Sequence, residues 1–301
     1  MGAAAPPLVS IIVGAYQAER TVERSLRSMQ EQSYQSTEII LVDSSPDNRT
    51  QQIVREKFPT VRYERSPRRL RPNAAQNRGA ELARGKLLLF TNPDIYAGPD
   101  WVNSLVSLQL SHGGAISGSI SCTGSGWLQT GMHLAKFDKW LPHGSVRPTD
   151  LGATANLLVE RAIFTSVGRF VGDSWVADTI FSWKLHAHGI PIWFAPQSVV
   201  WHDHLGGWWN LLRERFERGQ AFGSVRPAHF GWSKGRIVVQ IAATLLPLRL
   251  VGLIARTAQN AQAAGQLGRF ILTLPIVATG HAAWLAGELF GLVAQLRASS
   301  S

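Results

Sequence analysis

Short apolar runs alternate with amphipathic helical patterns over the first 100 residues. The apolar runs predict buried strands at 8–13, 39–42, 61–64 and 87–91, and the patterns between them predict helices at 21–29, 50–58 and 73–84. Strands that alternate with helices at this spacing are typical of a parallel sheet in an α/β layer fold. Ligands of such sheets bind beyond the carboxyl ends of the strands, so the residues that follow each strand are the first candidates for a site.

The rest of the chain has a different texture. Residues 101–230 form an irregular stretch with many Gly and Trp, in which the pattern predicts one clear helix at 178–188 and a strand-like run at 190–194. Two later segments, 237–255 and 270–287, are strongly apolar. The sequence therefore predicts an α/β region followed by a C-terminal apolar helical segment.

Composition narrows the class of protein. Of the 301 residues, 45% are hydrophobic, which is ample for a core and excludes wholesale disorder. Lys and Arg number 30 against 20 Asp and Glu, so we expect a polyanionic partner: nucleic acid, anionic lipid or a phosphorylated substrate. The eleven Trp are scattered from Trp101 to Trp284 and are not interleaved with basic residues, so the sequence argues against nucleic acid as the partner.

The chain has one cysteine, Cys122. A single cysteine excludes an intrachain disulfide and a zinc cluster built from cysteines, and it suits a reducing compartment. The first seven residues lack the charged and apolar regions of an export signal.

Two aspartates, Asp43 and Asp94, directly follow predicted strands. A nucleotide-sugar site needs one acidic residue to accept from the base or ribose and another to hold the divalent cation that bridges the diphosphate. Mg²⁺ and Mn²⁺ prefer such carboxylate oxygens. The alternative is structural, because the segments 43–46 and 92–94 are also favourable turn sequences, in which Asx side chains bond their own backbone.

Further segments accompany these aspartates in a fixed order along residues 8–230. They are Gly14-Ala15-Tyr16-Gln17, Val42-Asp43-Ser44-Ser45, Ala75-Gln76-Asn77-Arg78-Gly79, Asn92-Pro93-Asp94, Pro99-Asp100-Trp101, Ala153 to Asn156, and Ala177-Asp178 with the helix that follows. This order resembles that of the family 2 glycosyltransferases, which have the GT-A fold, a mostly parallel sheet with helices on both faces. The Asn-Pro-Asp segment resembles the variant of the rhamnosyltransferase-like branch.

The chain departs from the family's usual pattern at five positions. Gly14 and Gln17 replace the usual Pro and Asn, Gln76 replaces Arg, Asn92 replaces the first metal-binding Asp, and Ala177 replaces Glu. Asn92 can still ligate a metal through its amide oxygen, but without charge. None of these changes removes the aspartate expected to act in catalysis.

The resemblance implies a role for each matching residue. Asp178 is the implied base of an inverting sugar transfer, with Ala177 beside the acceptor. Independently of the resemblance, Trp175 flanks Asp178 and is a candidate to border the acceptor, because aromatic rings stack on sugar faces. The implied donor-binding residues are Gly14, Ala15, Tyr16, Gln17, Asp43, Gln76, Asn77, Asn92, Pro93 and Asp94. The implied ligands of Mg²⁺ or Mn²⁺ are Asp94, Asn92 and His202. Residues 1–100 would then form the donor-binding half and 101–233 the acceptor and catalytic half of one domain.

Several of these residues also have an ordinary structural interpretation. Asp178 opens a predicted helix, where aspartate is a good N-cap. His202 and His204 would face the same side of a strand and reach one ion, or they are packing histidines. The basic run Arg65, Arg68, Arg69 and Arg71 would bind phosphate or form a solvated loop.

The two apolar segments at the C-terminus suggest a membrane. Residues 237–255 carry one charge, Arg249, and 270–287 carry no formal charge, whereas a spanning helix needs about 20 mostly apolar residues. Three arrangements remain open: a spanning hairpin, helices in the interface, or a buried helical pair. Basic residues flank both segments, so we expect residues 234–301 to associate with anionic lipid, with the catalytic region in the cytoplasm.

The leading hypothesis is a membrane-associated glycosyltransferase. It would move a sugar from a nucleotide-diphosphate donor to a hydroxyl acceptor, which a lipid could carry, in cell-envelope polysaccharide or glycolipid synthesis. A dinucleotide-dependent oxidoreductase is disfavoured, because the turn at residues 14–17 lacks the G-x-G-x-x-G pattern. A non-catalytic sugar- or lipid-binding scaffold with the same fold is the alternative.

Overall fold

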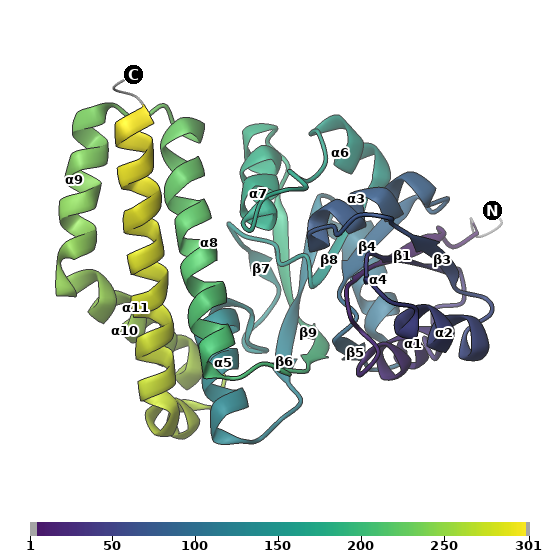
Figure 1. The fold of residues 1–301 in the computed structure, drawn as a ribbon. Coiled ribbons are helices and arrows are strands. Elements are labelled where there is room, and N and C mark those ends of the chain that lie inside the picture. Colours follow the sequence, from purple (N-terminus) through teal and green to yellow (C-terminus); the bar gives the residue numbers. More distant parts are fainter. Residues whose placement is uncertain (1–4, 299–301) are drawn as a thin grey trace. The chain divides into compact units, whose positions relative to one another are not determined.

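The computed structural model describes residues 5–298, which form two compact units. Unit 1 consists of the described residues up to Ser121 together with Pro142–Asp203. Unit 2 consists of Cys122–Leu141 together with the described residues from His204 onward. Figure 1 shows the sheet of unit 1 and the long helices of unit 2. The functional division at residues 100 and 233 stays a prediction.

Within residues 5–298, unit 1 is built on a nine-stranded sheet of order β3-β2-β1-β4-β8-β6-β9-β5, with β7 beside β9. Its first half is parallel, as predicted, and consists of β1 (Val9–Ala15), β2 (Thr37–Asp43), β3 (Arg62–Arg65) and β4 (Leu87–Thr91). The remaining strands are β5 (Ile95–Ala97), β6 (Ala115–Cys122), β7 (Arg147–Pro148), β8 (Asn156–Glu160) and β9 (Ile192–His202). β8 pairs antiparallel with β4 and β6, and β9 with β5 and β7, so the sheet is mixed.

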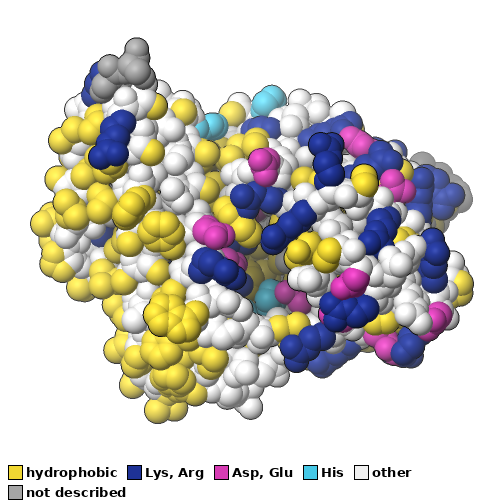
Figure 2. Space-filling model, in the orientation of Figure 1, with side chains coloured by type: hydrophobic (Ala, Val, Ile, Leu, Met, Phe, Trp, Pro, Cys, Tyr) yellow, Lys and Arg dark blue, Asp and Glu magenta, His cyan; other side chains and the backbone are white. Residues whose placement is uncertain are grey.

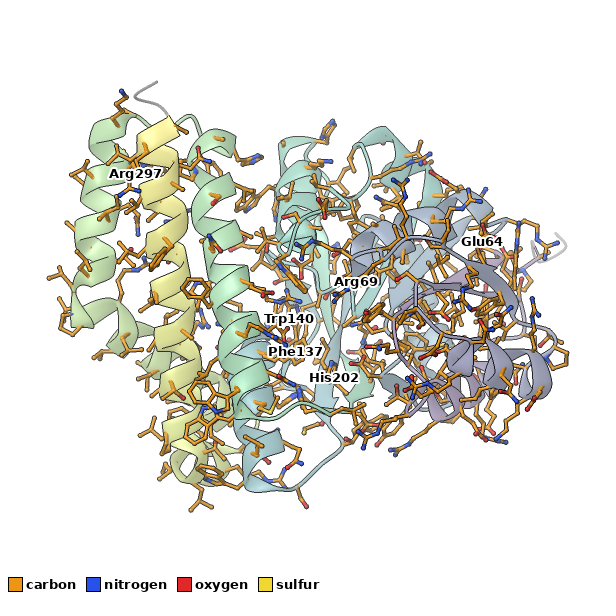
Figure 3. All side chains as sticks on the ribbon, in the orientation of Figure 1. Glu64, Arg69, Phe137, Trp140, His202 and Arg297 are labelled. Atoms are coloured by element: carbon orange, nitrogen blue, oxygen red, sulfur yellow. The ribbon has the colours of Figure 1, made fainter. Side chains whose placement is uncertain are left out.

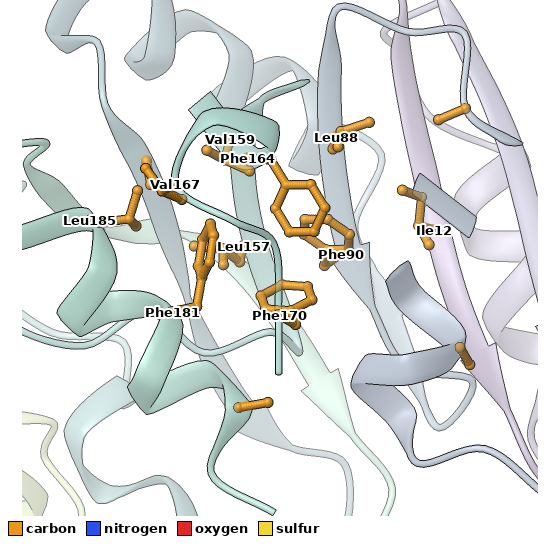
Figure 4. Close-up of a cluster of buried hydrophobic side chains, with 14 of the residues drawn as sticks. Ile12, Leu88, Phe90, Leu157, Val159, Phe164, Val167, Phe170, Phe181 and Leu185 are labelled. Carbon is orange, nitrogen blue, oxygen red and sulfur yellow. The ribbon is translucent and has the colours of Figure 1, made fainter. Parts of the chain in front are cut away.

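Helices cover both faces of this sheet (Figure 1). One face carries α1 (Val22–Gln30), α2 (Arg49–Lys57) and α4 (Trp101–His112), and the other carries α3 (Pro72–Leu82), α6 (Arg161–Ser166) and α7 (Ala177–Ala187). On the second face, Phe90, Phe164, Phe170 and Phe181 pack ring against ring in the core shown in Figure 4. α3 approaches β1 so closely that a Cβ on Gly79 would overlap Cγ2 of Ile12.

The prediction that residues 101–230 are irregular with one helix was wrong. Besides α7, this stretch contains α4, α5 (Trp127–Phe137), α6 and the 22-residue α8 (Trp208–His229). α8 carries charges along its length and has two internal glycines, which is not an apolar helical pattern. It forms because Gly219 and Gly223 let it pack against the backbone of the last helix, at Trp284 and Glu288.

The apolar C-terminal region consists of α9 (Lys234–Leu245), α10 (Pro247–Ala263) and α11 (Leu267–Ala298). The expected continuous segment 237–255 is broken between α9 and α10, which meet at a bend of 69°. Pro247 begins α10, where its missing N–H costs nothing but where it cannot continue the preceding helix. Within the described residues, α11 is the one helix that is long and apolar enough by itself to cross a membrane.

Candidate functional site

Apart from Gln76 and Asn77 on α3, the residues predicted to bind the donor follow strands that end at one edge of the sheet in unit 1. Ala15 is paired with Asp43 where β1 and β2 end, and Val13 is paired with Thr91 where β4 ends. Because these strands are parallel, their carboxyl ends meet at the same edge. The turn at 15–17, Asp43 and the segment 92–94 therefore lie at this edge, which we call the donor edge after the role predicted for these residues.

Asp43 is fully buried, and three hydrogen bonds hold its carboxylate. Oδ1 accepts from the backbone N–H of Ser45 at 2.8 Å and from its hydroxyl at 2.5 Å, and Oδ2 accepts from the hydroxyl of Tyr63 at 2.8 Å. Burial raises the pKa of Tyr63, and the hydrogen bond to Asp43 raises it further, so this phenol stays a donor. Asp43 is therefore a rigid acceptor.

Ser45 also connects the first turn to the second. Its hydroxyl oxygen accepts from the backbone N–H of Gln17 at 2.6 Å, and Gln17 takes a left-handed conformation with φ of 50°. The guanidinium of Arg69 lies over the ring of the adjacent Tyr16, 4.3 Å from its centre. Figure 3 labels Arg69 on the segment between β3 and α3. One basic side chain of the predicted run therefore lies at the donor edge.

The departure at Gly14 has a steric explanation. A Cβ at this position would lie 2.9 Å from the carbonyl oxygen of Pro72 and 3.1 Å from the Cβ of Ala75. The first turns of α3 thus pack directly on the end of β1, and a larger residue would push them away. The close approach brings the N-terminus of α3 to the donor edge.

Gln76 and Asn77 make structural contacts from α3. Gln76 is fully buried and donates to the carbonyls of Thr91 at 3.1 Å and Thr154 at 3.4 Å. The amide of Asn77 donates to the carbonyl of Phe170 at 2.9 Å and accepts from its N–H at 3.2 Å. Through these contacts both side chains position other segments of the chain, and their part in donor binding stays a prediction.

Asp94 lies beside His202. β5 begins directly after Asp94 and pairs with β9 so that Ile95 faces His202, and the N–H of Asp203 donates to the carbonyl of Asp94 at 2.8 Å. His202 Nε2 is 3.4 Å from Asp94 Oδ2. Within residues 5–298, the buried Oδ1 of Asp94 accepts no hydrogen bond. A buried carboxylate oxygen without a donor, next to an imidazole nitrogen, is an arrangement that fits a divalent cation.

The strand that would place His202 and His204 on one side ends before His204. β9 ends at His202, and His204 lies beyond it, where its Nε2 is 3.2 Å from His133 Nδ1. The alternation that places residues two apart on one side of a strand therefore does not extend to His204. Figure 3 labels His202.

Asp178 is half-buried in the first turn of α7, directly after the buried Val176 and Ala177. Its Oδ1 accepts from the N–H of Thr179 at 2.8 Å, and its Oδ2 accepts no hydrogen bond from the described residues. Ala177 is fully buried in the core with Phe181. The hydrogen bond to Oδ1 thus fixes the orientation of the Asp178 carboxylate, and Oδ2 can accept a hydrogen bond from a bound molecule.

Contacts from the start of α3 reach the segment that leads into α7. Arg71 pairs with Asp173 at 3.0 Å, and its guanidinium stacks on the ring of Trp175, 4.3 Å from the centre. With the two bonds between Asn77 and Phe170, these contacts connect the start of α3 to the chain just before α7. The positioning roles of Ser45, Tyr63 and Arg71 were not predicted, although Arg71 belongs to the basic run noted in the sequence.

Comparisons with known proteins relate this chain to glycosyltransferases. Residues 10–159 match the family described as glycosyl transferase family 2. An uncharacterized glycosyltransferase of Haemophilus influenzae is 30% identical over 109 residues, which cover 35% of this chain and 44% of that protein. Glycosyltransferase AglE of Haloferax volcanii is 22% identical over 258 residues, covering 83% of this chain and 82% of AglE. This chain spans about half the length of the first curated relatives that it matches.

A solved structure extends the likeness to the fold. The mannosyltransferase PcManGT from Pyrobaculum calidifontis, in complex with GDP-Man and Mn²⁺, is 18% identical with a TM-score of 0.56, covering 91% of this chain and 88% of that chain. The fold is therefore of the GT-A type, as predicted. The family match and the glycosyltransferase relatives support glycosyltransferase family 2 as the family of the chain.

We expect Tyr63→Phe to destabilise the protein by about 1–3 kcal/mol, because the buried Oδ2 of Asp43 loses its donor. The matched control is Tyr34→Phe, which removes a hydroxyl that donates to the half-exposed carbonyl of Pro7. Urea unfolding of both variants measures the difference. Equal loss of stability in the two variants would contradict the role given to Tyr63.

Proposed function

We propose that this protein transfers a sugar from a nucleotide-diphosphate donor to a hydroxyl acceptor, with inversion at the anomeric carbon. The observation that carries the proposal is the meeting of Asp43, the turn at 15–17 and the Asp94–His202 pair at one edge of the parallel strands. Asp43 would accept from the nucleoside, with Tyr16 close to the base. The resemblance of Asn92-Pro93-Asp94 to the rhamnosyltransferase-like variant favours a hexose or deoxyhexose donor.

Asp94, Asn92 and His202 would hold Mg²⁺ or Mn²⁺. The fit rests on the unpartnered buried oxygen of Asp94 and on the imidazole nitrogen 3.4 Å from its second oxygen. A divalent cation at this position would neutralise charge on the leaving diphosphate. Arg69, on the same edge, adds positive charge, and the short loop between β4 and β5 fixes the position of Asp94.

Asp178 would act as the base that takes the proton of the acceptor hydroxyl. Its Oδ1 is fixed by the N–H of Thr179, which leaves Oδ2 to accept the proton. Trp175, stacked on Arg71, would border the acceptor, since aromatic rings pack well on sugar faces. Ala177, fully buried in the core with Phe181, would act on the acceptor only through the position that it gives to the adjacent Asp178.

The central test of this proposal is Asp178→Asn, which we expect to slow transfer by about 10²–10⁴-fold while nucleotide binding is unchanged. The amide keeps the shape but cannot accept the proton. Asp150→Asn, at an exposed aspartate, is the control. The measurement is release of nucleoside diphosphate from UDP-glucose and GDP-mannose with Mn²⁺ and a bacterial lipid extract as acceptor. Undiminished release by the Asp178 variant would exclude it as the base, and release by neither protein would favour the non-catalytic scaffold.

Asp94→Ala should abolish the part of nucleotide binding that depends on metal, because the uncharged Asn92 cannot replace the carboxylate. Thermal shifts with UDP and GDP, each with and without Mn²⁺, measure this part directly. The exposed Asp100, whose carboxylate accepts from Ser33, provides the control Asp100→Ala. An Mn²⁺ effect of the same size in the Asp94 and Asp100 variants would place the metal elsewhere.

We further propose that unit 2 binds the surface of an anionic membrane without crossing it. α11 packs along α8 through Gly287 and Gly291, whose Cβ positions would meet the α8 backbone at Phe216 and Gln220. A crossing by α11 would therefore carry α8 into the bilayer with its charges, which are Arg213, Glu214, Arg215, Glu217, Arg218 and Arg226. Each charge at the bilayer centre costs about 2.5–3.5 kcal/mol or more.

The charges of α8 persist in the folded protein. Burial raises the pKa of Glu214, but the charges of Lys136 and Arg218 outweigh it and hold the pKa at about 2. Glu288, fully buried in α11, pairs with Arg226 at 2.7 Å and Arg249 at 3.0 Å. These ion pairs bind α11 to its neighbours within unit 2, as in the interior of a helical bundle.

The membrane contact would instead use what we call the apolar surface of unit 2, formed by exposed side chains near the α9–α10 bend and the start of α11. They are Val239, Leu245, Leu246, Leu248, Val251, Ile271 and Leu272. Figure 2 shows hydrophobic side chains gathering over these helices. Apolar side chains in the interface and basic residues near anionic headgroups would together hold the protein at a lipid-linked acceptor. Placement of the catalytic unit in the cytoplasm stays a prediction.

Leu248→Gln should weaken binding to vesicles of phosphatidylglycerol and phosphatidylethanolamine by about tenfold, because a side chain 72% exposed in water would lose its burial in lipid. Leu110→Gln, at a leucine that is 66% exposed in α4 of unit 1, should bind like the unmodified protein. Vesicle co-sedimentation compares the two. Equal binding by both variants, or no binding by the unmodified protein, would contradict a contact through the apolar surface.

A further inference from the structure

One cysteine and two histidines from three separate segments meet in unit 2. Cys122 ends β6, His133 lies in the middle of α5, and His204 follows β9. One ligand atom from each of the three residues lies within 4.8 Å of the other two. His133 and His204 are 2% and 8% exposed, and Cys122 is half-buried. No spacing in the sequence indicates this cluster, because the three segments meet only in the folded chain.

The distance between the two imidazole nitrogens fits tetrahedral coordination. His133 Nδ1 and His204 Nε2 are 3.2 Å apart. Two nitrogens bound to one tetrahedral ion at about 2.0–2.1 Å would be separated by about 3.3 Å. The thiol of Cys122 donates to the carbonyl of Gln129 at 3.8 Å, a weak interaction that a metal–thiolate bond would readily replace.

The surroundings are those of a shielded metal site. The ring of Phe137 lies 5.5 Å from His133 and 6.1 Å from His204, centre to centre, and it packs in turn on Trp140. Figure 3 labels Phe137 and Trp140. The half-buried thiol provides access for the ion. Three protein ligands leave a fourth tetrahedral position for water.

The ligand atoms of this cluster favour a different metal from the one proposed to bind at Asp94. A thiolate and two imidazoles are ligands typical of Zn²⁺, whereas Mg²⁺ and Mn²⁺ prefer the oxygens offered by Asp94 and Asn92. The neighbouring histidine, His202, pairs with Asp94 and is not a member of the cluster. The two sites therefore differ in residues and in chemistry.

We propose that Cys122, His133 and His204 bind a Zn²⁺ ion that ties together the chain segments from which unit 2 is built. Cys122 is the first residue of one of these segments and His204 is the first residue of the other. His133 lies on α5, which packs on α11 with no room for a side chain at Gly131, whose Cβ would meet Ile276 at 2.7 Å. The ion would thus attach the first residues of both segments, Cys122 and His204, to α5 and the helices that it packs on. The proposed role of the ion is to hold these segments together, and the proposal does not depend on the reaction proposed above.

The test uses the full chain, purified without a histidine tag, stripped with chelator and reloaded with Zn²⁺. Mass spectrometry of the metal should give one zinc per chain. Loading with Co²⁺ instead should give a thiolate-to-cobalt charge-transfer band and the visible bands of a tetrahedral ion. Zn²⁺ should also raise the melting temperature, because an ion that binds only the folded state stabilises it.

Cys122→Ser should remove the charge-transfer band and reduce zinc affinity by at least about 100-fold, whereas His112→Ala, at an exposed histidine of unit 1, should change neither. Asp94→Ala should retain the zinc. Circular dichroism identifies any variant that fails to fold. If the Cys122 variant does not fold, the cobalt spectrum of the unmodified chain tests the proposal by itself. Absence of stoichiometric zinc, a cobalt spectrum without the thiolate band, or loss of zinc in the Asp94 variant would each overturn the proposal.

Discussion

The pairing of β5 with β9 is the constraint on which the chemistry of unit 1 depends. Asp94 stands at the end of a parallel strand, where an isolated carboxylate would have only water as a partner. The short β5 turns the chain immediately and pairs Ile95 with His202, more than 100 residues away in the sequence. The backbone bond from Asp203 to the carbonyl of Asp94 fixes this register. A slip of one residue would direct the imidazole to the other side of the sheet.

The second half of the site is brought to the first by α3. Glycines at 14 and 79 allow this helix to lie directly on β1. From there, Asn77 and Arg71 hold the segment that leads into α7 and Asp178. The same helix, α3, therefore positions both the donor edge and the proposed base. It can do so because Gly14 and Gly79 have no side chains that would hold it away from β1.

The sequence predicted the first 100 residues well because buried parallel strands are continuous apolar runs bounded by turns, and these can be recognised without tertiary information. It failed for α8, whose charged residues and glycines make sense only against α11. Pro247 was noted within the segment 237–255, but the bend between two helices at this proline was not predicted. The cluster of Cys122, His133 and His204 was not predictable, because neither its spacing nor its composition matches a local metal-binding pattern. The position of His202 beside Asp94 was implied by the family resemblance alone.

The central claim is that Asp94 and His202 hold a divalent cation at the diphosphate of the donor. Electron spin echo spectroscopy of Mn²⁺ bound to the protein with GDP or UDP, whichever raises the melting temperature, measures this contact directly. The account predicts a ¹⁴N coupling from an imidazole together with a ³¹P coupling from the nucleotide, and loss of the ¹⁴N coupling in His202→Ala. A ³¹P coupling without any nitrogen coupling, or a nitrogen coupling that persists in the His202 variant, would contradict it.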